Sequence, residues 1–174
     1  IALKTPKNDS ARKRFKRSAV VSAKVNHPNV AKTLDYFQVG EREYLIEEFL
    51  EGSDLQNGIL NSVFVIDPYI TARIFHHLAK GIAASHHVKV IHRDIKPSNI
   101  LVVGGMNLNE IKITDFGIAK LAEEEFIEIV EGGEDSISSS KTVVGALPYM
   151  SPESINTPRE VGLATDIWSL GALM

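Results

Sequence analysis

The 174-residue sequence contains no cysteine, which excludes both a disulfide framework and a zinc site built from thiolates. It has no apolar run approaching the roughly 20 residues that span a bilayer. Its first residues also lack the basic start and apolar middle of a secretion signal. We therefore expect no membrane contact within this segment. A chain without cysteine fits a reducing compartment, so the cytoplasm is the expected location.

Acidic residues are almost missing from the first 30 positions, where eight Lys or Arg stand against Asp9 alone. Such a basic segment raises the question of nucleic-acid binding. The basic cluster from Arg12 to Arg17, however, contains a single aromatic residue, Phe15, and the whole chain carries a net charge of −3. We expect no nucleic-acid partner.

The first 50 residues predict a small antiparallel sheet with one helix. The expected elements are the end of a strand at residues 1–4, a helix over 11–25, and two strands at 32–39 and 43–49 around a turn at 40–42. Asp9 or Ser10 can cap the helix, and Pro28 stops it. An apolar fraction of 44% with 24% charged residues is ordinary for a globular protein and names no function.

The pattern becomes mainly helical after Gly52. Asp67 can cap a helix with Pro68 in its first turn, and this helix carries apolar residues every four positions along one face, at Ile70, Ile74, Leu78 and Ile82. Short strands are expected at 100–103 and 110–114, followed by a polar loop at 123–140. Thr165 can cap a last helix that begins at Asp166.

Three short motifs carry residue types that phosphoryl transfer requires. Lys4 ends an apolar strand, where it presents a fixed positive charge to phosphates. The octapeptide at 92–99, His-Arg-Asp-Ile-Lys-Pro-Ser-Asn, puts a carboxylate five residues before a carboxamide, and Asp115-Phe116-Gly117 directly follows a predicted strand. Carboxylate and amide oxygens, here from Asp115 and Asn99, suit a hard cation such as magnesium.

Together these motifs resemble the catalytic domain of serine/threonine protein kinases, most closely the bacterial members of this eukaryotic-like family. The resemblance covers essentially the whole chain. It extends to four further segments: Asn26-His27-Pro28-Asn29, Glu48-Phe49-Leu50-Glu51-Gly52, Tyr149-Met150-Ser151-Pro152-Glu153 and Asp166-Ile167-Trp168-Ser169-Leu170-Gly171. It implies a partial bilobal α+β fold, with residues 1–50 in the N-lobe and 51–174 in the mainly helical C-lobe.

The resemblance also implies a function: ATP-dependent phosphoryl transfer to serine or threonine hydroxyls of protein substrates, with Mg²⁺. The implied roles are proton acceptor for Asp94, phosphate contact for Lys96, magnesium ligands for Asn99 and Asp115, phosphate pairing for Lys4, and main-chain adenine contacts for Glu48 and Leu50. Lysine at position 96 points to serine or threonine substrates. Together with the segment at 149–153, which resembles the family's peptide-substrate platform, it disfavours the small-molecule phosphotransferases of related fold.

Several positions depart from the family pattern. The glycine-rich loop and the last C-lobe helices lie outside the chain, so we expect an inactive fragment whose activity belongs to a longer protein. Ser18 stands where the family's helix glutamate should pair with the strand lysine, and Ala146 replaces a threonine. These two changes motivate an alternative, a catalytically weak nucleotide-binding or scaffold module.

A further departure suggests a compensation. Glu47 falls at the back of the adenine pocket, where apolar residues are usual, and we hypothesise that its carboxylate lies within about 6 Å of the Lys4 nitrogen and supplies the missing partner. In the polar segment after Asp115, phosphorylation of Ser138 or Ser140 is one interpretation and a solvated loop is the other. The paired histidines at 76–77 and 86–87 favour no metal site, and His92 is expected to pack beneath the catalytic loop.

Overall fold

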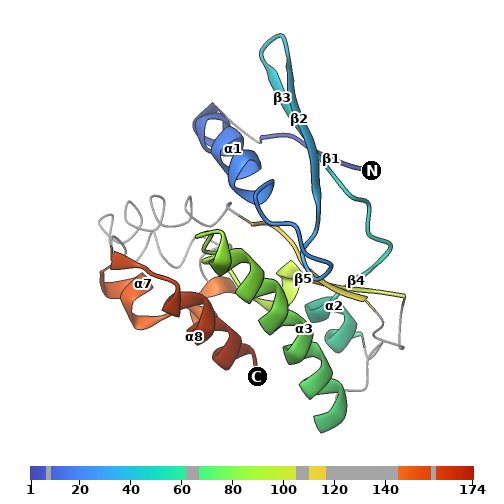
Figure 1. Cartoon of the computed structure of the whole chain (residues 1–174), viewed down its shortest axis with the longest axis vertical. Coiled ribbons are helices and arrows are strands. Elements are labelled where there is room, and N and C mark those ends of the chain that lie inside the picture. The colour runs from blue at the N-terminus through green and yellow to red at the C-terminus, as the bar shows by residue number, and fades with distance from the viewer. Residues whose placement is uncertain (7–8, 62–66, 105–109, 117–144, 158–159) are drawn as a thin grey trace.

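The computed structural model describes residues 1–6, 9–61, 67–104, 110–116, 145–157 and 160–174. Figure 1 shows two parts, with α1 and the first three strands above the larger helical part. The elements are β1 (Ala2–Lys4), α1 (Asp9–Ser22), β2 (Thr33–Val39), β3 (Arg42–Glu47), β4 (Gly52–Asp54), α2 (Leu55–Leu60), α3 (Pro68–His87), η1 (Pro97–Asn99), β5 (Ile100–Val103), β6 (Glu110–Ile113), η3 (Leu147–Tyr149), α7 (Pro152–Asn156) and α8 (Ala164–Leu173).

The first sheet is antiparallel in the order β1-β3-β2, which confirms the expected hairpin. Gly40 turns the hairpin with φ +59°, a left-handed conformation that suits glycine. Helix α1 packs beside this sheet, but its bounds differ from the prediction because it starts at Asp9 and ends at Ser22. The early end arises because Val25 N–H donates to the Ser22 carbonyl, which tightens the last turn and places Val25 in the core.

The second sheet is antiparallel in the order β4-β5-β6. Strands β5 and β6 agree with the prediction, whereas β4 was not foreseen. Gly52 explains how β4 can pair so closely with β5, because a Cβ at this position would lie 2.1 Å from the Val102 carbonyl oxygen. Only glycine fits, and a short polar strand therefore forms where sequence periodicity gave no signal.

Helix α3 forms the centre of the larger part, as its apolar stripe predicted. Asp67 caps it by accepting a hydrogen bond from Ile70 N–H, and Pro68 stands in the first turn. Its buried face carries Leu78, exposed by 0%, and packs on strand β6 in a core against which the partly buried Val21 of α1 also packs. Among the described residues, no helix combines the length and apolar character needed to cross a membrane.

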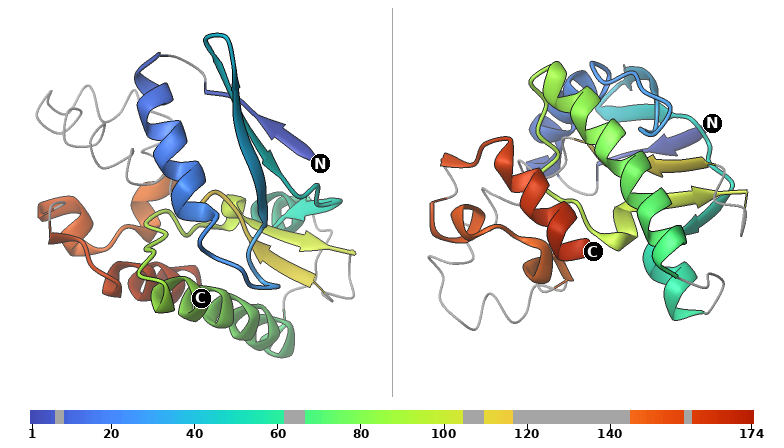
Figure 2. Two further views of the ribbon diagram at one scale, coloured as in Figure 1. Left: turned by 45° about the horizontal axis from the view of Figure 1, so that its top comes forward. Right: turned by 60° about the horizontal axis from the view of Figure 1, so that its bottom comes forward.

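Helix α8 lies beside α3 (Figure 2) and begins one residue before its predicted cap. The prediction that Thr165 caps this helix is wrong, because Thr165 lies inside its first turn and is exposed by 1%. The Thr165 hydroxyl instead hydrogen-bonds with the hydroxyls of Ser151 and Ser154. In this buried cluster the Thr165 hydroxyl supplies a hydrogen-bond partner to the two serines, and these tertiary contacts outweigh its preference for capping.

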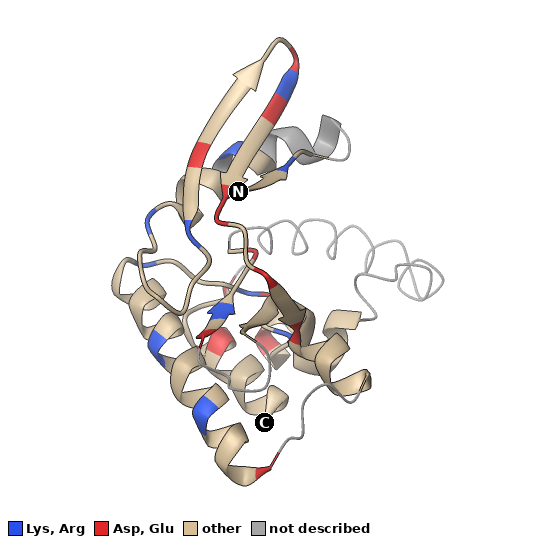
Figure 3. Cartoon of the chain, turned by 90° about the vertical axis from the view of Figure 1, so that its right-hand side faces the viewer, with Lys and Arg blue, Asp and Glu red and all other residues tan. Residues whose placement is uncertain are grey.

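Figure 3 shows acidic and basic residues interspersed over the described part of the chain. Most side chains of the basic cluster at 12–17 fall outside that part, so the expected absence of a nucleic-acid partner stays a prediction.

Candidate functional site

A pocket of about 320 Å³ lies between the two sheets, along the segment that joins them. Five residues singled out from the sequence line it: Lys4, Glu47, Glu48, Leu50 and Asp115. The structure adds seven that sequence reasoning missed: Ala2, Ala31, Phe49, Asp54, Ser98, Leu101 and Thr114. Strand alternation would have found Ala2, which shares a face with Lys4, whereas Leu101 and Asp54 reach the pocket through long-range pairing.

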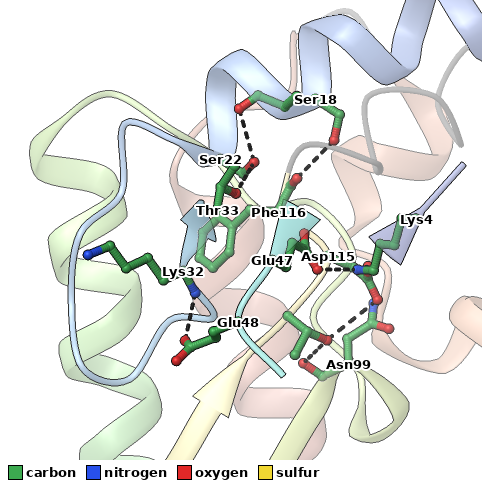
Figure 4. A network of polar contacts seen from close by, with 12 residues as sticks. Lys4, Ser18, Ser22, Lys32, Thr33, Glu47, Glu48, Asn99, Asp115 and Phe116 are labelled. Carbon is green, nitrogen blue, oxygen red and sulfur yellow. Dashed lines mark hydrogen bonds and ion pairs between the residues drawn. The ribbon is translucent and has the colours of Figure 1, made fainter. Parts of the chain in front are cut away.

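Lys4 is held by two carboxylates at the back of this pocket (Figure 4). Its Nζ lies 2.7 Å from Glu47 Oε2 and 2.5 Å from Asp115 Oδ1. The first distance confirms the hypothesis that Glu47 pairs with Lys4, and the second partner was not foreseen. Burial lowers the pKa of Lys4, but the charges and hydrogen bonds of Asp115 and Glu47 outweigh it, so the pKa is raised above its usual value.

Helix α1 reaches the site through a hydroxyl. Ser18 is buried, and its Oγ donates to the Phe116 carbonyl at 3.1 Å. One turn later, Ser22 Oγ and Thr33 Oγ1 lie 2.8 Å apart. Through Ser18 the helix is therefore bonded to the segment that carries Asp115.

The three residues predicted to be catalytic lie together. Lys96 Nζ is 2.8 Å from Asp94 Oδ2, and Asn99 Nδ2 donates to the same oxygen at 2.9 Å and to the Asp94 carbonyl at 2.8 Å. Because the amide nitrogen of Asn99 is used in this way, its Oδ1 is the atom left for a cation. Thr114, the neighbour of Asp115, donates its N–H to the Asn99 carbonyl at 2.9 Å, which ties the two predicted magnesium ligands into one structure.

The two predicted magnesium ligands, Asn99 and Asp115, suit the chemistry of Mg²⁺. Asp115 has φ +63°, a left-handed conformation that is rare for a residue with a side chain and is typical of functional sites. Among the described residues, no three His, Cys, Asp or Glu side chains form a metal site. Two oxygen ligands from the protein suit Mg²⁺, which is commonly held by one or two protein groups together with phosphates.

The loop that carries Asp94 is anchored by a residue that sequence reasoning did not assign to the site. Asp166 is fully buried, and its carboxylate accepts hydrogen bonds from His92 N–H at 2.9 Å and Arg93 N–H at 2.8 Å. His86 Nε2 lies 2.8 Å from the same carboxylate. These bonds hold Arg93 at φ +69°. The sequence offered two signals for Asp166, its place near the start of a predicted helix and its membership of a segment that carries the family resemblance.

His92 packs beneath the catalytic loop, as predicted. Its ring is fully buried, lies 4.5 Å from the Phe116 ring between centroids, and has Nε2 2.8 Å from the Thr114 carbonyl oxygen. It therefore joins the loop at Asp94 to the segment at Asp115. A role in packing, and not in proton transfer, follows from this burial.

The side chain of Glu48 connects strand β6 to the segment just before β2. Its carboxylate accepts two hydrogen bonds from Lys112 Nζ, at 2.8 and 2.9 Å, and one from Lys32 N–H at 2.7 Å. Lys112 is also 3.1 Å from Glu110. Burial lowers the pKa of Lys112, but the hydrogen bonds to Glu48 and Glu110 outweigh it and raise the pKa overall. Glu48 lines the pocket, and its expected main-chain contact with adenine stays a prediction.

Some predictions lie outside the described residues. Gly117, the acidic segment, and the phosphorylation sites Ser138 and Ser140 are among them. Ala146 lies among the described residues and is buried, and as an alanine it provides no hydroxyl there.

Comparison with known proteins agrees with this geometry. The family described as "Protein kinase domain" matches residues 1–174. An Aurora kinase from Saccharomyces cerevisiae is 34% identical over 166 residues, which cover 92% of this chain and 39% of that protein. The serine/threonine-protein kinase PrkC of Bacillus subtilis is 31% identical over 165 residues, covering 93% of this chain and 23% of that protein.

A third relative, the serine/threonine-protein kinase pkn2 of Myxococcus xanthus, is 32% identical over 160 residues, covering 92% of this chain and 18% of that protein. The chain thus spans well under half the length of the curated relatives it matches.

Proposed function

The chain belongs to the protein kinase domain family, and we propose that the protein containing it transfers the terminal phosphate of ATP to serine or threonine hydroxyls of protein substrates. The observation that carries this proposal is the juxtaposition of Asp94, Lys96 and Asn99 next to a pocket that holds Lys4 and Asp115. An acceptor carboxylate, two cations for phosphate oxygens and two oxygen ligands for Mg²⁺ are the groups that this reaction needs.

The side chains divide the work as follows. The Asp94 carboxylate orients the substrate hydroxyl and accepts its proton, while Lys96, 2.8 Å away, offsets charge on the transferred phosphate. Lys4 neutralises phosphate oxygens from the opposite side. Asn99 Oδ1 and Asp115 would hold Mg²⁺, which supplies positive charge to the phosphate oxygens when bound.

The nucleotide base belongs in the same pocket. Main-chain atoms of Glu48 and Leu50 contact adenine, and the apolar side chains of Ala2 and Leu101 line the space beside it. Residues 1–50 form the N-lobe and residues 51–174 the C-lobe, so the base binds where the two lobes join. A cytoplasmic location and phosphorylation of Ser138 or Ser140 remain predictions from the sequence.

The decisive test compares the full natural protein with its Asp94→Asn variant. Transfer of labelled γ-phosphate to peptides containing serine or threonine should fall by about 10²- to 10⁴-fold, because the proton acceptor is lost. Binding of a fluorescent ATP analogue should be retained. Asp35→Asn is the matched control, since Asp35 is an exposed residue of β2 whose carboxylate accepts a hydrogen bond from the N–H of its neighbour Tyr36, and this variant should keep full activity.

One other function is favoured by specific observations. Ser18 bonds the Phe116 carbonyl in place of a helix carboxylate near Lys4, and Ala146 carries no hydroxyl, so a nucleotide-binding scaffold without transfer activity is the second candidate. Equal, background-level transfer by wild type and Asp94→Asn, with ATP binding intact in both, would favour the scaffold.

A further inference from the structure

We propose that Glu47 is the positioning residue for Lys4, so that the phosphate-binding lysine is anchored within its own sheet and independently of helix α1. This inference rests on the proposed function for its catalytic meaning. The anchoring itself is a property of the folded chain, and it can be tested without any phosphoryl transfer.

The geometry of the sheet makes the pair. Strands β1 and β3 are antiparallel neighbours in which Ala2 stands opposite Glu47 and Lys4 opposite Leu45. Lys4 and Glu47 are therefore diagonal neighbours on one face, within reach of long side chains. Their charged atoms lie 2.7 Å apart, and Glu47 is exposed by only 8%. Backbone pairing of two adjacent strands thus fixes the contact, and no separate element has to move to complete it.

Helix α1 offers no carboxylate near Ser18, the residue by which it reaches the site. The sequence has no Asp or Glu from residue 11 to residue 26, so the helix has no carboxylate beyond its first two residues. Ser18 occupies the inner face instead and donates to the Phe116 carbonyl at 3.1 Å. In protein kinases generally, a glutamate of this helix pairs with the lysine, and moving the helix controls activity. Here the position of α1 is linked to the Asp115 segment, and the lysine keeps its partner wherever the helix lies.

Competition for Asp115 explains why a second carboxylate matters. Lys4 contacts both Glu47 and Asp115, at 2.7 and 2.5 Å, and Asp115 is the proposed magnesium ligand. A cation held by Asp115 would place positive charge near the ammonium group, and Glu47 would then keep Lys4 in place. Without Glu47, Asp115 would be the remaining partner of Lys4, so the ammonium group and the cation would compete directly for one carboxylate.

The first measurement is the reactivity of Lys4 in the full natural protein, read at one fixed pH as its acylation rate by an amine-selective reagent, with mass spectrometry of the Lys4 peptide. Glu47→Gln removes one of two carboxylates at constant size, so the ammonium group is held less firmly and its acylation rate should rise by about 3- to 10-fold. Glu41→Gln, at the exposed hairpin tip, is the matched control.

The second measurement is the Mg²⁺ dependence of binding of a fluorescent ATP analogue. Glu47→Gln should raise the half-saturating Mg²⁺ concentration several-fold, because Lys4 is left to compete for Asp115. Glu41→Gln should match wild type. Glu47→Asp, which keeps the charge on a shorter side chain, should lie between wild type and Glu47→Gln in both measurements.

The outcomes separate the two proposals. An unchanged Lys4 acylation rate in Glu47→Gln, or an equal change in Glu41→Gln, would overturn the anchoring role. Failure of the wild type to bind nucleotide would overturn the proposed function, yet the acylation rates would still decide the anchor. If circular dichroism shows that Glu47→Gln is unfolded, Glu47→Met, with an apolar side chain of similar length, replaces it under the same expectations.

Discussion

Replacing Asp166 by asparagine tests how much of the catalytic-loop structure depends on one buried carboxylate. The side chain is exposed by 0% and accepts hydrogen bonds from two backbone N–H groups, of His92 and Arg93, at 2.9 and 2.8 Å. The two bonds go to different oxygens. An asparagine has one acceptor oxygen, so in either orientation one backbone N–H faces an NH₂ group that cannot accept a hydrogen bond.

The expected loss of stability follows from this count. A hydrogen bond to a charged group contributes about 1.5–3 kcal/mol, and a buried donor left unsatisfied costs about 1–3 kcal/mol. We therefore expect Asp166→Asn to lower the free energy of unfolding by about 2–4 kcal/mol. With a urea dependence of about 2 kcal/mol per M, the unfolding midpoint should fall by about 1–2 M. Phosphoryl transfer should fall as well, because Arg93 at φ +69° loses its support.

Urea unfolding can be followed through the fluorescence of Trp168, which lies on α8 and is the chain's one tryptophan. Asp67→Asn is the control, since the same chemical change occurs at an exposed helix cap where asparagine caps as well as aspartate, and its midpoint should stay within about 0.3 M. A shift for Asp166→Asn no larger than that of the control would refute the reasoning.

Two further predictions concern the contact between α3 and the segment before β2. Gly81→Ala should destabilise the fold by about 1–2 kcal/mol, because its Cβ would lie 3.0 Å from the Asn29 carbonyl oxygen. Gly171→Ala should instead stabilise helix α8 slightly, because nothing lies within 4 Å of its Cβ. The thermal unfolding temperatures of the two variants should therefore shift in opposite directions, and shifts in the same direction would contradict the packing argument. Burial lowers the pKa of His77, and nearby positive charge adds to this, so the folded state favours its neutral form. The contribution of His77 to stability should be constant above about pH 6.5 and fall below it. When unfolding is measured from pH 7.5 to 5, the fall in stability should be smaller in His77→Gln.

Elements with a local signal were predictable from the sequence. Helix α3 was predicted because its apolar stripe, its Asp67 cap and Pro68 all lie within one segment. Strand β4 gave no signal, since Gly-Ser-Asp carries no β-forming pattern and pairs only because β5 lies alongside. Thr165 was misread for the same reason, because its capping preference is local whereas the hydroxyls that it contacts come from another helix.

The candidate site shows the same division. Asp94, Lys96 and Asn99 are close in the chain, so their spacing was enough to predict that they act together. The pairing of Lys4 with Glu47 was predictable by elimination, since helix α1 offered no carboxylate beyond Asp9 at its start. Its contact with Asp115 joins residues 111 positions apart, and no spacing rule reaches that far.

The sequence by itself determined the family, the order of the elements and the types of residue at the site, because these depend on motifs and short-range periodicity. Only the tertiary structure decided which charges meet: Lys4 between two carboxylates, Glu48 bonded to Lys112, and Asp166 beneath the catalytic loop. Each of these contacts joins distant segments, and burial makes it obligatory, since a charge removed from water must find its partner inside the fold.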